Sequence, residues 1–173
     1  MSHLSSGKVV SLFIFLLVLD LTVLPVLIAN PFRPILIYLF VLYGLFETNT
    51  RFSILLALAA GLLRDLIVSG PFALETMLLV TFTFAFDRAL SKFDRTSLFT
   101  RAGVSWFFIF LVTFLNMLVT QIFFAGSGIH QAPVFAISIQ AATASAIAMP
   151  LFSYLAARWF RARIAFKQYE LFR

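Results

Sequence analysis

The chain has 173 residues, of which 62% are hydrophobic and only 12% are charged. Soluble domains average about 45–50% apolar and about 25% charged residues, so this composition argues against a soluble protein. The chain has no cysteine, which excludes disulfides and thiolate metal sites. The net charge of +6 does not indicate nucleic-acid binding, because the cations stand at the ends of apolar blocks, as in membrane proteins.

The apolar blocks predict an all-α polytopic membrane protein that forms one integral membrane domain over residues 1–173. A helix crosses a bilayer with about 20 residues, so this length accommodates about six spans. The first block is longer than the apolar core of a signal peptide and more blocks follow it, so we expect a retained anchor. The predicted spans are 9–29, 34–48, 52–68, 72–88, 102–125 and 134–157.

The predicted spans differ in how clearly the sequence marks them. Prolines on either side of Phe32 and Arg33 indicate a turn after the first span. The spans at 34–48, 52–68 and 72–88 have short apolar cores, for which tilted spans, a thinned bilayer and a re-entrant hairpin all remain open. The last two spans are long enough to cross without such adjustment.

The lysines and arginines predict the orientation. If the N-terminus is cytoplasmic and the chain crosses six times, only Arg33 and Arg64 lie outside. The positive-inside rule favours this arrangement, so we expect both termini to be cytoplasmic. The eleven cations that then lie inside are Lys8, Arg51, Arg88, Lys92, Arg95, Arg101, Arg158, Arg161, Arg163, Lys167 and Arg173.

This topology places five charged residues, Asp20, Arg33, Arg64, Asp65 and Glu75, in the outer half of the protein. A charge at mid-membrane costs about 2.5–3.5 kcal/mol on insertion scales, so such residues usually pair inside the protein. Arg64 and Asp65 point about 100° apart on a helix and should find partners on other helices. An ion-pair network that fixes helix register is the favoured interpretation, and a substrate pocket or proton path is the alternative.

Within this group we expect different roles. Asp65 is expected to anchor a buried polar joint. Arg64 is expected to be interfacial, and Glu75 to reach the outer interface.

Small residues predict close helix packing at two places. Ala57 and Gly61 are four residues apart, which lets helices approach closely. Residues 141–148, which include Ala144, are mostly alanine and follow Gln140. We expect both stretches to pack against other helices of the chain, and a partner protein's helix is the alternative for the first.

One face of the fifth span carries Thr113, Asn116 and Thr120. Thr143 and Gln140 on the sixth span are suitable partners for these groups across a close helix pair. Such bonds average about 0.6 kcal/mol in membranes, so they would specify the pairing more than stabilise it. A small polar cavity lined by the same residues is the other interpretation.

No enzyme motif is present: the chain lacks HExxH, GxxxxGK, GxSxG and a cysteine nucleophile. Ser127 and His130 stand in a glycine-containing turn, which is more typical of a solvated loop than of a hydrolase. Two histidines more than 120 residues apart do not make a metal site. We therefore expect no enzymatic activity, no cofactor and no metal.

The loop at 87–101 and the tail at 158–173 mix cations with large apolar residues. This pattern suits helices that lie on the anionic lipid of the inner leaflet, and contact with a cytoplasmic protein is the alternative. The cations concerned are Arg88, Lys92, Arg95, Arg158, Arg161, Arg163 and Lys167.

Several short motifs resemble MreD, the family of bacterial rod shape-determining membrane proteins. They are Arg33-Pro34, Leu42-Tyr43, Gly61-Leu62 with Asp65, and Ser69-Gly70. The chain departs from the family at Ala73, where a glycine is expected, at Gly44, where an aromatic residue is expected, and at 47–51, where the family often has proline and glycine.

The resemblance implies a non-enzymatic scaffold of the cell-elongation complex in the bacterial inner membrane. Its implied partners are MreC, the actin-like MreB, and RodA with penicillin-binding protein 2. It also implies a six-helix fold similar to the substrate-binding subunits of ECF-type vitamin transporters. A transporter subunit is therefore the alternative function.

Overall fold

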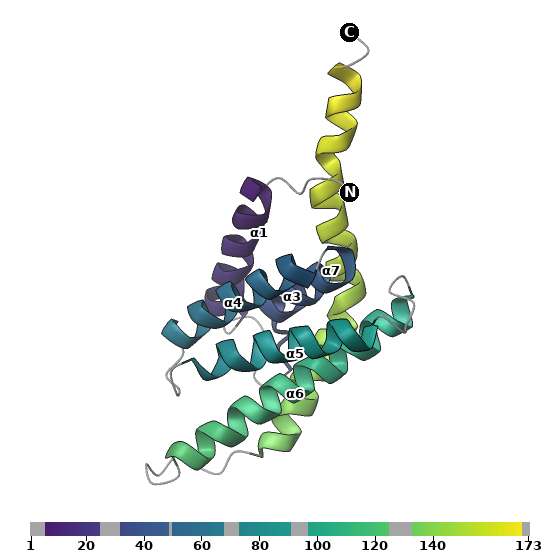
Figure 1. The fold of residues 1–173 in the computed structure, drawn as a ribbon. Coiled ribbons are helices and arrows are strands. Elements are labelled where there is room, and N and C mark those ends of the chain that lie inside the picture. Colours follow the sequence, from purple (N-terminus) through teal and green to yellow (C-terminus); the bar gives the residue numbers. More distant parts are fainter. Residues whose placement is uncertain are drawn as a thin grey trace.

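The computed structural model describes residues 6–24, 32–48, 50–67, 73–90, 97–124 and 133–170, with the side chains of residues 6, 124 and 161–170 left undescribed. Every regular element in these ranges is a helix, so the prediction of an all-α protein is confirmed. Figure 1 shows the elements α1 (Ser6–Val18), the π-helical turn η1 (Leu19–Val23), α3 (Leu36–Glu47), α4 (Thr50–Ile67), α5 (Leu74–Leu90), α6 (Leu98–Phe124) and α7 (Val134–Glu170).

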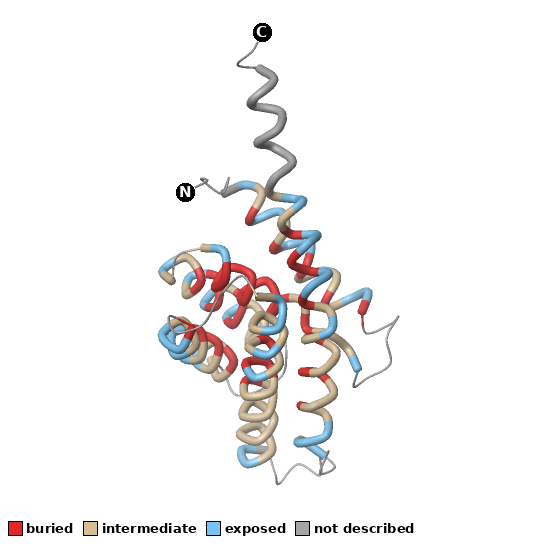
Figure 2. Tube along the Cα trace, turned by 90° about the vertical axis from the view of Figure 1, so that its right-hand side faces the viewer, coloured by how far each residue is buried: buried red, intermediate tan, exposed pale blue. Residues whose placement is uncertain are grey.

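The helices form two pairs around a short central helix. α4 packs on α5, and α6 packs on α7. The central helix, α3, contacts both pairs and also α1. Figure 2 shows that buried residues gather where α3 lies. The short helix is therefore the core of the fold rather than a connection between longer ones.

α3 is apolar on every side, and residues 37–46 are all buried. A helix that is hydrophobic all round belongs in an interior, where each face meets another apolar surface. With 12 residues it is about 18 Å long, well short of the thickness of a bilayer core. Aromatic contacts fix it to its neighbours: Phe40 packs on Phe13 of α1, and Tyr43 packs on Phe152 of α7.

Other helices accept the hydrogen bonds of the amides at the N-terminal end of α3. The first amides of a helix lack partners within the helix, and burial makes an unpaired amide costly. The amide of Ile35 donates to Ser145 Oγ of α7 at 3.1 Å, and the amide of Leu36 donates to Asp20 Oδ1 at 3.4 Å. At the other end, the amide and hydroxyl of Thr48 both donate to the carbonyl of Gly44. Residues distant in sequence thus provide the hydrogen-bond acceptors for the amides at the N-terminal end of this helix.

Replacing Ser145 with alanine should therefore destabilise the protein by about 1–3 kcal/mol, because the buried amide of Ile35 loses its acceptor. Ser138 is the matched control: it is also buried on α7, but its hydroxyl bonds only to the Val134 carbonyl of its own helix. We expect Ser138→Ala to change stability by about 0.5 kcal/mol or less. Thermal unfolding in detergent measures both, and equal effects would contradict the capping role.

Two described helices are long and apolar enough to cross a membrane. They cover Leu98–Phe123 of α6 and Val134–Phe160 of α7, and only a minority of the residues in their apolar windows are buried by the rest of the protein. Exposed apolar side chains such as Phe107, Ile147 and Leu151 suit a lipid surrounding.

The basic segments differ from their predicted form. The loop predicted at 87–101 is shorter, because α5 continues to Leu90, which is almost fully buried, and α6 already begins at Leu98. Arg88 therefore lies on α5, with its guanidinium 5.1 Å from the ring of Phe84. Lys92 and Arg95 lie outside the described residues.

The tail predicted as a separate surface helix is instead the end of α7, which runs unbroken from Val134 to Glu170 and passes through Pro150. Arg158 is exposed on it. The side chains of Arg161, Arg163 and Lys167 lie outside the described ones.

Candidate functional site: a buried charge cluster and the adjoining cavity

Arg64 stands at the centre of a buried charge cluster. Its Nη1 lies 3.3 Å from Asp20 Oδ2, and its Nε lies 2.5 Å from Glu75 Oε1, as an ion pair whose angle does not suit a hydrogen bond. The three side chains come from α4, η1 and α5, and they are 12%, 2% and 3% exposed. The expectations that Arg64 is interfacial and that Glu75 reaches the interface are therefore wrong. Each buried carboxylate needs a cation, and Arg64 lies within ion-pair distance of both.

Tyr38 of α3 joins this cluster, and the sequence interpretation missed it. Its hydroxyl donates to Glu75 Oε1, and the Arg64 guanidinium carbon lies 5.0 Å from the centre of its ring. In the sequence, a tyrosine within an apolar block is easily counted as one more hydrophobic residue. Tyr38 could have been recognised as a polar residue of the core because a buried tyrosine hydroxyl normally finds a hydrogen-bond partner.

Asp65 turns to the neighbouring helix rather than to an arginine. Its Oδ1 accepts from the amide of Glu75 at 3.0 Å, and its Oδ2 accepts from the amide and the hydroxyl of Thr76 at 2.9 and 2.6 Å. These amides belong to the first turn of α5, where helices lack internal partners. Asp65 thus caps α5 from α4 and also places a negative charge at the positive end of that helix.

An Asp65→Ala variant should lose about 0.5–2 kcal/mol of stability, the usual range for a lost N-terminal cap. Asp65→Asn should lose less, because an amide oxygen still accepts a hydrogen bond from a backbone amide. Chemical or thermal unfolding of the two variants in the same detergent measures the order. If asparagine were as damaging as alanine, the charge rather than the hydrogen bonds would explain the role of Asp65.

Close contact between α4 and α5 makes this capping geometrically possible. A Cβ atom added at Gly61 would lie 2.4 Å from Thr76 Cα and 2.9 Å from Thr76 N, which is too close for any side chain. Ala57 and Ala60, on the same side of α4, are fully buried. The residue that Gly61 approaches is therefore the residue that Asp65 caps, so the two contacts depend on each other.

The polar residues of α6 and α7 pair differently from the expected pattern. One hydrogen bond between these helices runs from Trp106 Nε1 to Thr143 Oγ1 at 3.1 Å, and Thr120 bonds to the carbonyl of Asn116 in its own helix. Thr143 thus accepts a hydrogen bond from the Trp106 indole, a partner that the sequence interpretation did not consider. Gln140 and Ala144 are partly buried on α7.

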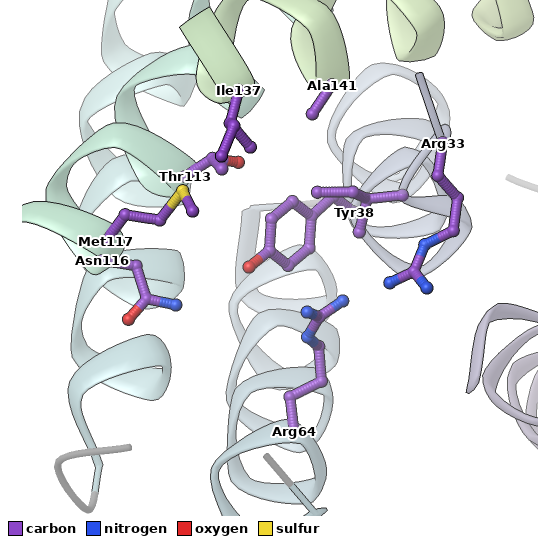
Figure 3. Close-up of a pocket in the computed structure, with 9 residues that line it drawn as sticks. Arg33, Tyr38, Arg64, Thr113, Asn116, Met117, Ile137 and Ala141 are labelled. Carbon is purple, nitrogen blue, oxygen red and sulfur yellow. The ribbon is translucent and has the colours of Figure 1, made fainter. Parts of the chain in front are cut away.

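A cavity of about 400 Å³ adjoins the cluster. Figure 3 shows Arg33 and Arg64 reaching in from separate segments, Tyr38 between them and α6, and Thr113 and Asn116 on α6. The complete lining comprises Arg33, Ile35, Tyr38, Arg64, Thr113, Asn116, Met117, Ile137 and Ala141. Among the described residues, this lining includes two arginines and no carboxylate, and Asp20 and Glu75 are not part of it.

A second polar joint lies at the other end of the α4–α5 pair. Arg101 Nη2 contacts Glu47 Oε1 at 2.7 Å, and the hydroxyl of Thr50 donates to Asp87 Oδ2 at 2.7 Å. Glu47 is 41% exposed, so this ion pair is more hydrated than the Arg64 cluster. It ties the end of α3 to the start of α6.

The described residues contain no group of three His, Cys, Asp or Glu side chains that could hold a metal ion. Ser127 and His130 lie outside the described residues. Chemically, the Arg64 cluster can hold charges inside an apolar protein, and the cavity can hold a polar ligand.

The fold and its buried cluster define an all-helical membrane protein with a polar joint at its core. The chain matches the family model described as rod shape-determining protein MreD over residues 5–158, and it belongs to that family. This confirms the resemblance noted in the sequence. No curated protein and no solved structure matches the chain, so the likeness to ECF-transporter subunits stays a prediction.

The structure also gives a physical meaning to one departure from the family pattern. Ala73, where a glycine was expected, has φ = 64°, in the left-handed region that favours glycine. That conformation costs a side-chain-bearing residue about 1–2 kcal/mol. Ala73 directly precedes α5, so the strain sits beside the turn that Asp65 caps.

We therefore expect Ala73→Gly to stabilise the protein by about 0.5–1 kcal/mol. The substitution removes the backbone strain, and the larger entropy that glycine loses on folding offsets part of this gain. Ala85→Gly, at an exposed position in the middle of α5, should instead destabilise by about 0.5–1 kcal/mol. Differential scanning calorimetry on both proteins measures whether each substitution raises or lowers the unfolding temperature. A loss of stability in Ala73→Gly would contradict the strain.

Proposed function

We propose that the chain is a non-enzymatic membrane scaffold of the bacterial cell-elongation complex, and that it links MreC to the peptidoglycan synthesis machinery. The observation that carries this proposal is the family match over residues 5–158. MreB and RodA with penicillin-binding protein 2 are the further partners in the wider complex. The family is known for determining cell shape and not as an enzyme family.

The packing supports a structural role. The Arg64 cluster joins η1, α4 and α5, while Asp65 and Gly61 fix α4 against α5. Interactions of this kind specify one arrangement of helices in a surrounding where apolar contact alone discriminates poorly. A rigid arrangement is what a scaffold needs to present a constant surface to its partners.

We also propose six spans in the inner membrane with both termini cytoplasmic. The Glu47–Arg101 joint would then lie on the cytoplasmic side, and the Arg64 cluster would lie in the outer half. Reporter fusions after residues 48 and 124 test this topology, because the first should report the cytoplasm and the second the outside.

The exposed face of α4 is a suitable contact for the membrane helix of MreC. It presents Leu55, Leu58, Leu62 and Leu66 in one ridge, with 38–70% of each residue exposed. Leucines at this spacing on one face match the apolar stripe of a paired helix.

The absence of cysteine makes the contact testable by cross-linking. Single cysteines at Leu58, Leu62 or Leu66 should give a cross-link to cysteine-bearing MreC in membranes, whereas Leu151→Cys on the exposed face of α7 is the control. Depletion of the protein in a rod-shaped host should also produce round cells. The proposal would be dropped if neither MreC association nor rounding occurred.

A substrate-binding subunit of a small-molecule transporter is the second candidate, because the cavity lies beside the charge cluster. Saturable binding of a vitamin-type ligand by the purified protein, abolished by Asn116→Leu, would favour it. Asp65 is a poor variant for this test since it caps α5 and does not line the cavity.

A further inference from the structure

The two arginines that line the cavity differ in their electrostatic state. Arg64 is held between Asp20 and Glu75, two carboxylates outside the cavity lining whose charges together exceed its own. Arg33 forms no ion pair with the described residues, although it stands close enough to Asp20 to interact with its charge. The residues that line the cavity therefore carry two positive charges and no negative one, while Asp20, outside the lining, interacts with the charges of both arginines.

The wall contributed by α6 offers polar groups. Thr113 Oγ1 is buried and has no hydrogen-bond partner among the described residues, and Asn116 presents a side-chain amide to the same space. A buried hydroxyl without a partner is costly in an apolar surrounding, so an additional group that bonds to it would be stabilising. Figure 3 shows both residues on α6, which lines the side of the cavity next to Tyr38.

The remaining lining is apolar and comes from α7, from α6 and from the residues before α3. It consists of Ile35, Met117, Ile137 and Ala141. A volume of about 400 Å³ lies within the usual range for sites that hold small ligands or a lipid headgroup. The combination of guanidinium, hydroxyl, amide and apolar surface selects an anion that carries an apolar portion.

We propose that this cavity binds a phosphate or carboxylate group attached to an apolar body, with Arg33 as its principal ligand. The guanidinium donates two parallel hydrogen bonds to such an oxyanion, and Thr113 and Asn116 donate from the opposite wall. Arg64 also lines the cavity, with its charge engaged by Asp20 and Glu75. An anionic phospholipid and a free amphiphilic anion carry the same chemistry. This binding function goes beyond the scaffold function.

The test uses the full chain in an uncharged detergent and follows unfolding by tryptophan fluorescence as probe is added. The probes are lauroyl lysophosphatidylglycerol, inorganic phosphate and the uncharged monolaurin. Ligands that bind only the folded state raise its apparent stability in proportion to affinity. We expect lysophosphatidylglycerol to raise the unfolding temperature saturably and monolaurin to leave it unchanged.

Arg33→Gln should weaken the apparent affinity by about tenfold or more, in line with the loss of a charge-assisted hydrogen bond. Asn116→Leu gives a second variant that removes a donor while all charges remain, and it should also weaken binding. Arg158→Gln removes an exposed arginine on α7 away from the cavity lining and should bind as the unmodified protein does.

The probes separate the two sources of the ligand. Binding of lysophosphatidylglycerol without binding of inorganic phosphate assigns the site to a lipid headgroup, and binding of both assigns it to free anions as well. Either result supports the proposal. Equal shifts with monolaurin, or equal affinities in Arg33→Gln and Arg158→Gln, would overturn it.

Discussion

Gly61→Ala is expected to destabilise the protein by at least about 1–3 kcal/mol, the range for overpacking of a well-packed interior. The new methyl group would lie 2.4 Å from Thr76 Cα. The α4 backbone fixes the position of this Cβ and Thr76 Cα belongs to the α5 backbone, so neither atom can rotate away. The helices α4 and α5 must then separate. Separation also stretches the hydrogen bonds from Thr76 to Asp65, so the loss exceeds that of a simple clash.

Gly103 is the matched control for this substitution. It also lies inside a helix, α6, but a Cβ added there meets nothing within 4 Å. Gly103→Ala should therefore gain about 0.5–1 kcal/mol from helix propensity alone. Thermal unfolding in detergent compares the two, and cell shape after replacement of the chromosomal copy reports function. If both variants were stabilised, the contact between α4 and α5 would be looser than the structure shows.

Arg64→Met should lose about 3–5 kcal/mol, because it leaves the buried carboxylates of Asp20 and Glu75 without their cation. Methionine retains most of the length of the side chain, so the change in packing is small. Arg101→Met is the control, since its partner Glu47 is 41% exposed and such pairs contribute about 0–1 kcal/mol. Unfolding monitored by circular dichroism should separate the two variants clearly.

A rescue experiment distinguishes lost charge balance from lost packing. Combining Arg64→Met with Asp20→Asn and Glu75→Gln removes both unpaired charges, and neutral replacement of a buried ion network is often tolerated. We expect the triple variant to recover most of the lost stability. If it remained as unstable as Arg64→Met, the side chain of Arg64 would act through shape instead of charge.

The sequence alone was sufficient for the helical class and for selecting the charged residues that need partners, but it missed Tyr38 and misjudged the positions of Arg64 and Glu75. Long apolar blocks have few structural solutions, since a bilayer requires every backbone group to be paired. Charged residues inside those blocks are conspicuous because each one needs a partner. Asp20, Arg64 and Glu75 could therefore be selected from composition and topology, and the small side chain of Gly61 marked a close contact.

Which groups pair with which was decided only by the tertiary structure. In a soluble protein the apolar face of a helix marks the side that meets the core, but lipid tails are as apolar as leucine. The pattern therefore gave no sign that α3 is buried on every side, or that Arg64 points inward and Tyr38 reaches Glu75.

The cap that Asp65 provides to α5, and the one that Ser145 provides to α3, depend on segments brought together by folding. Such contacts join residues that have no periodic relation in the sequence, so no local pattern could specify them. The sequence by itself thus determined which residues cannot face lipid, and the packing of α3 against both helix pairs decided where each of them finds its partner.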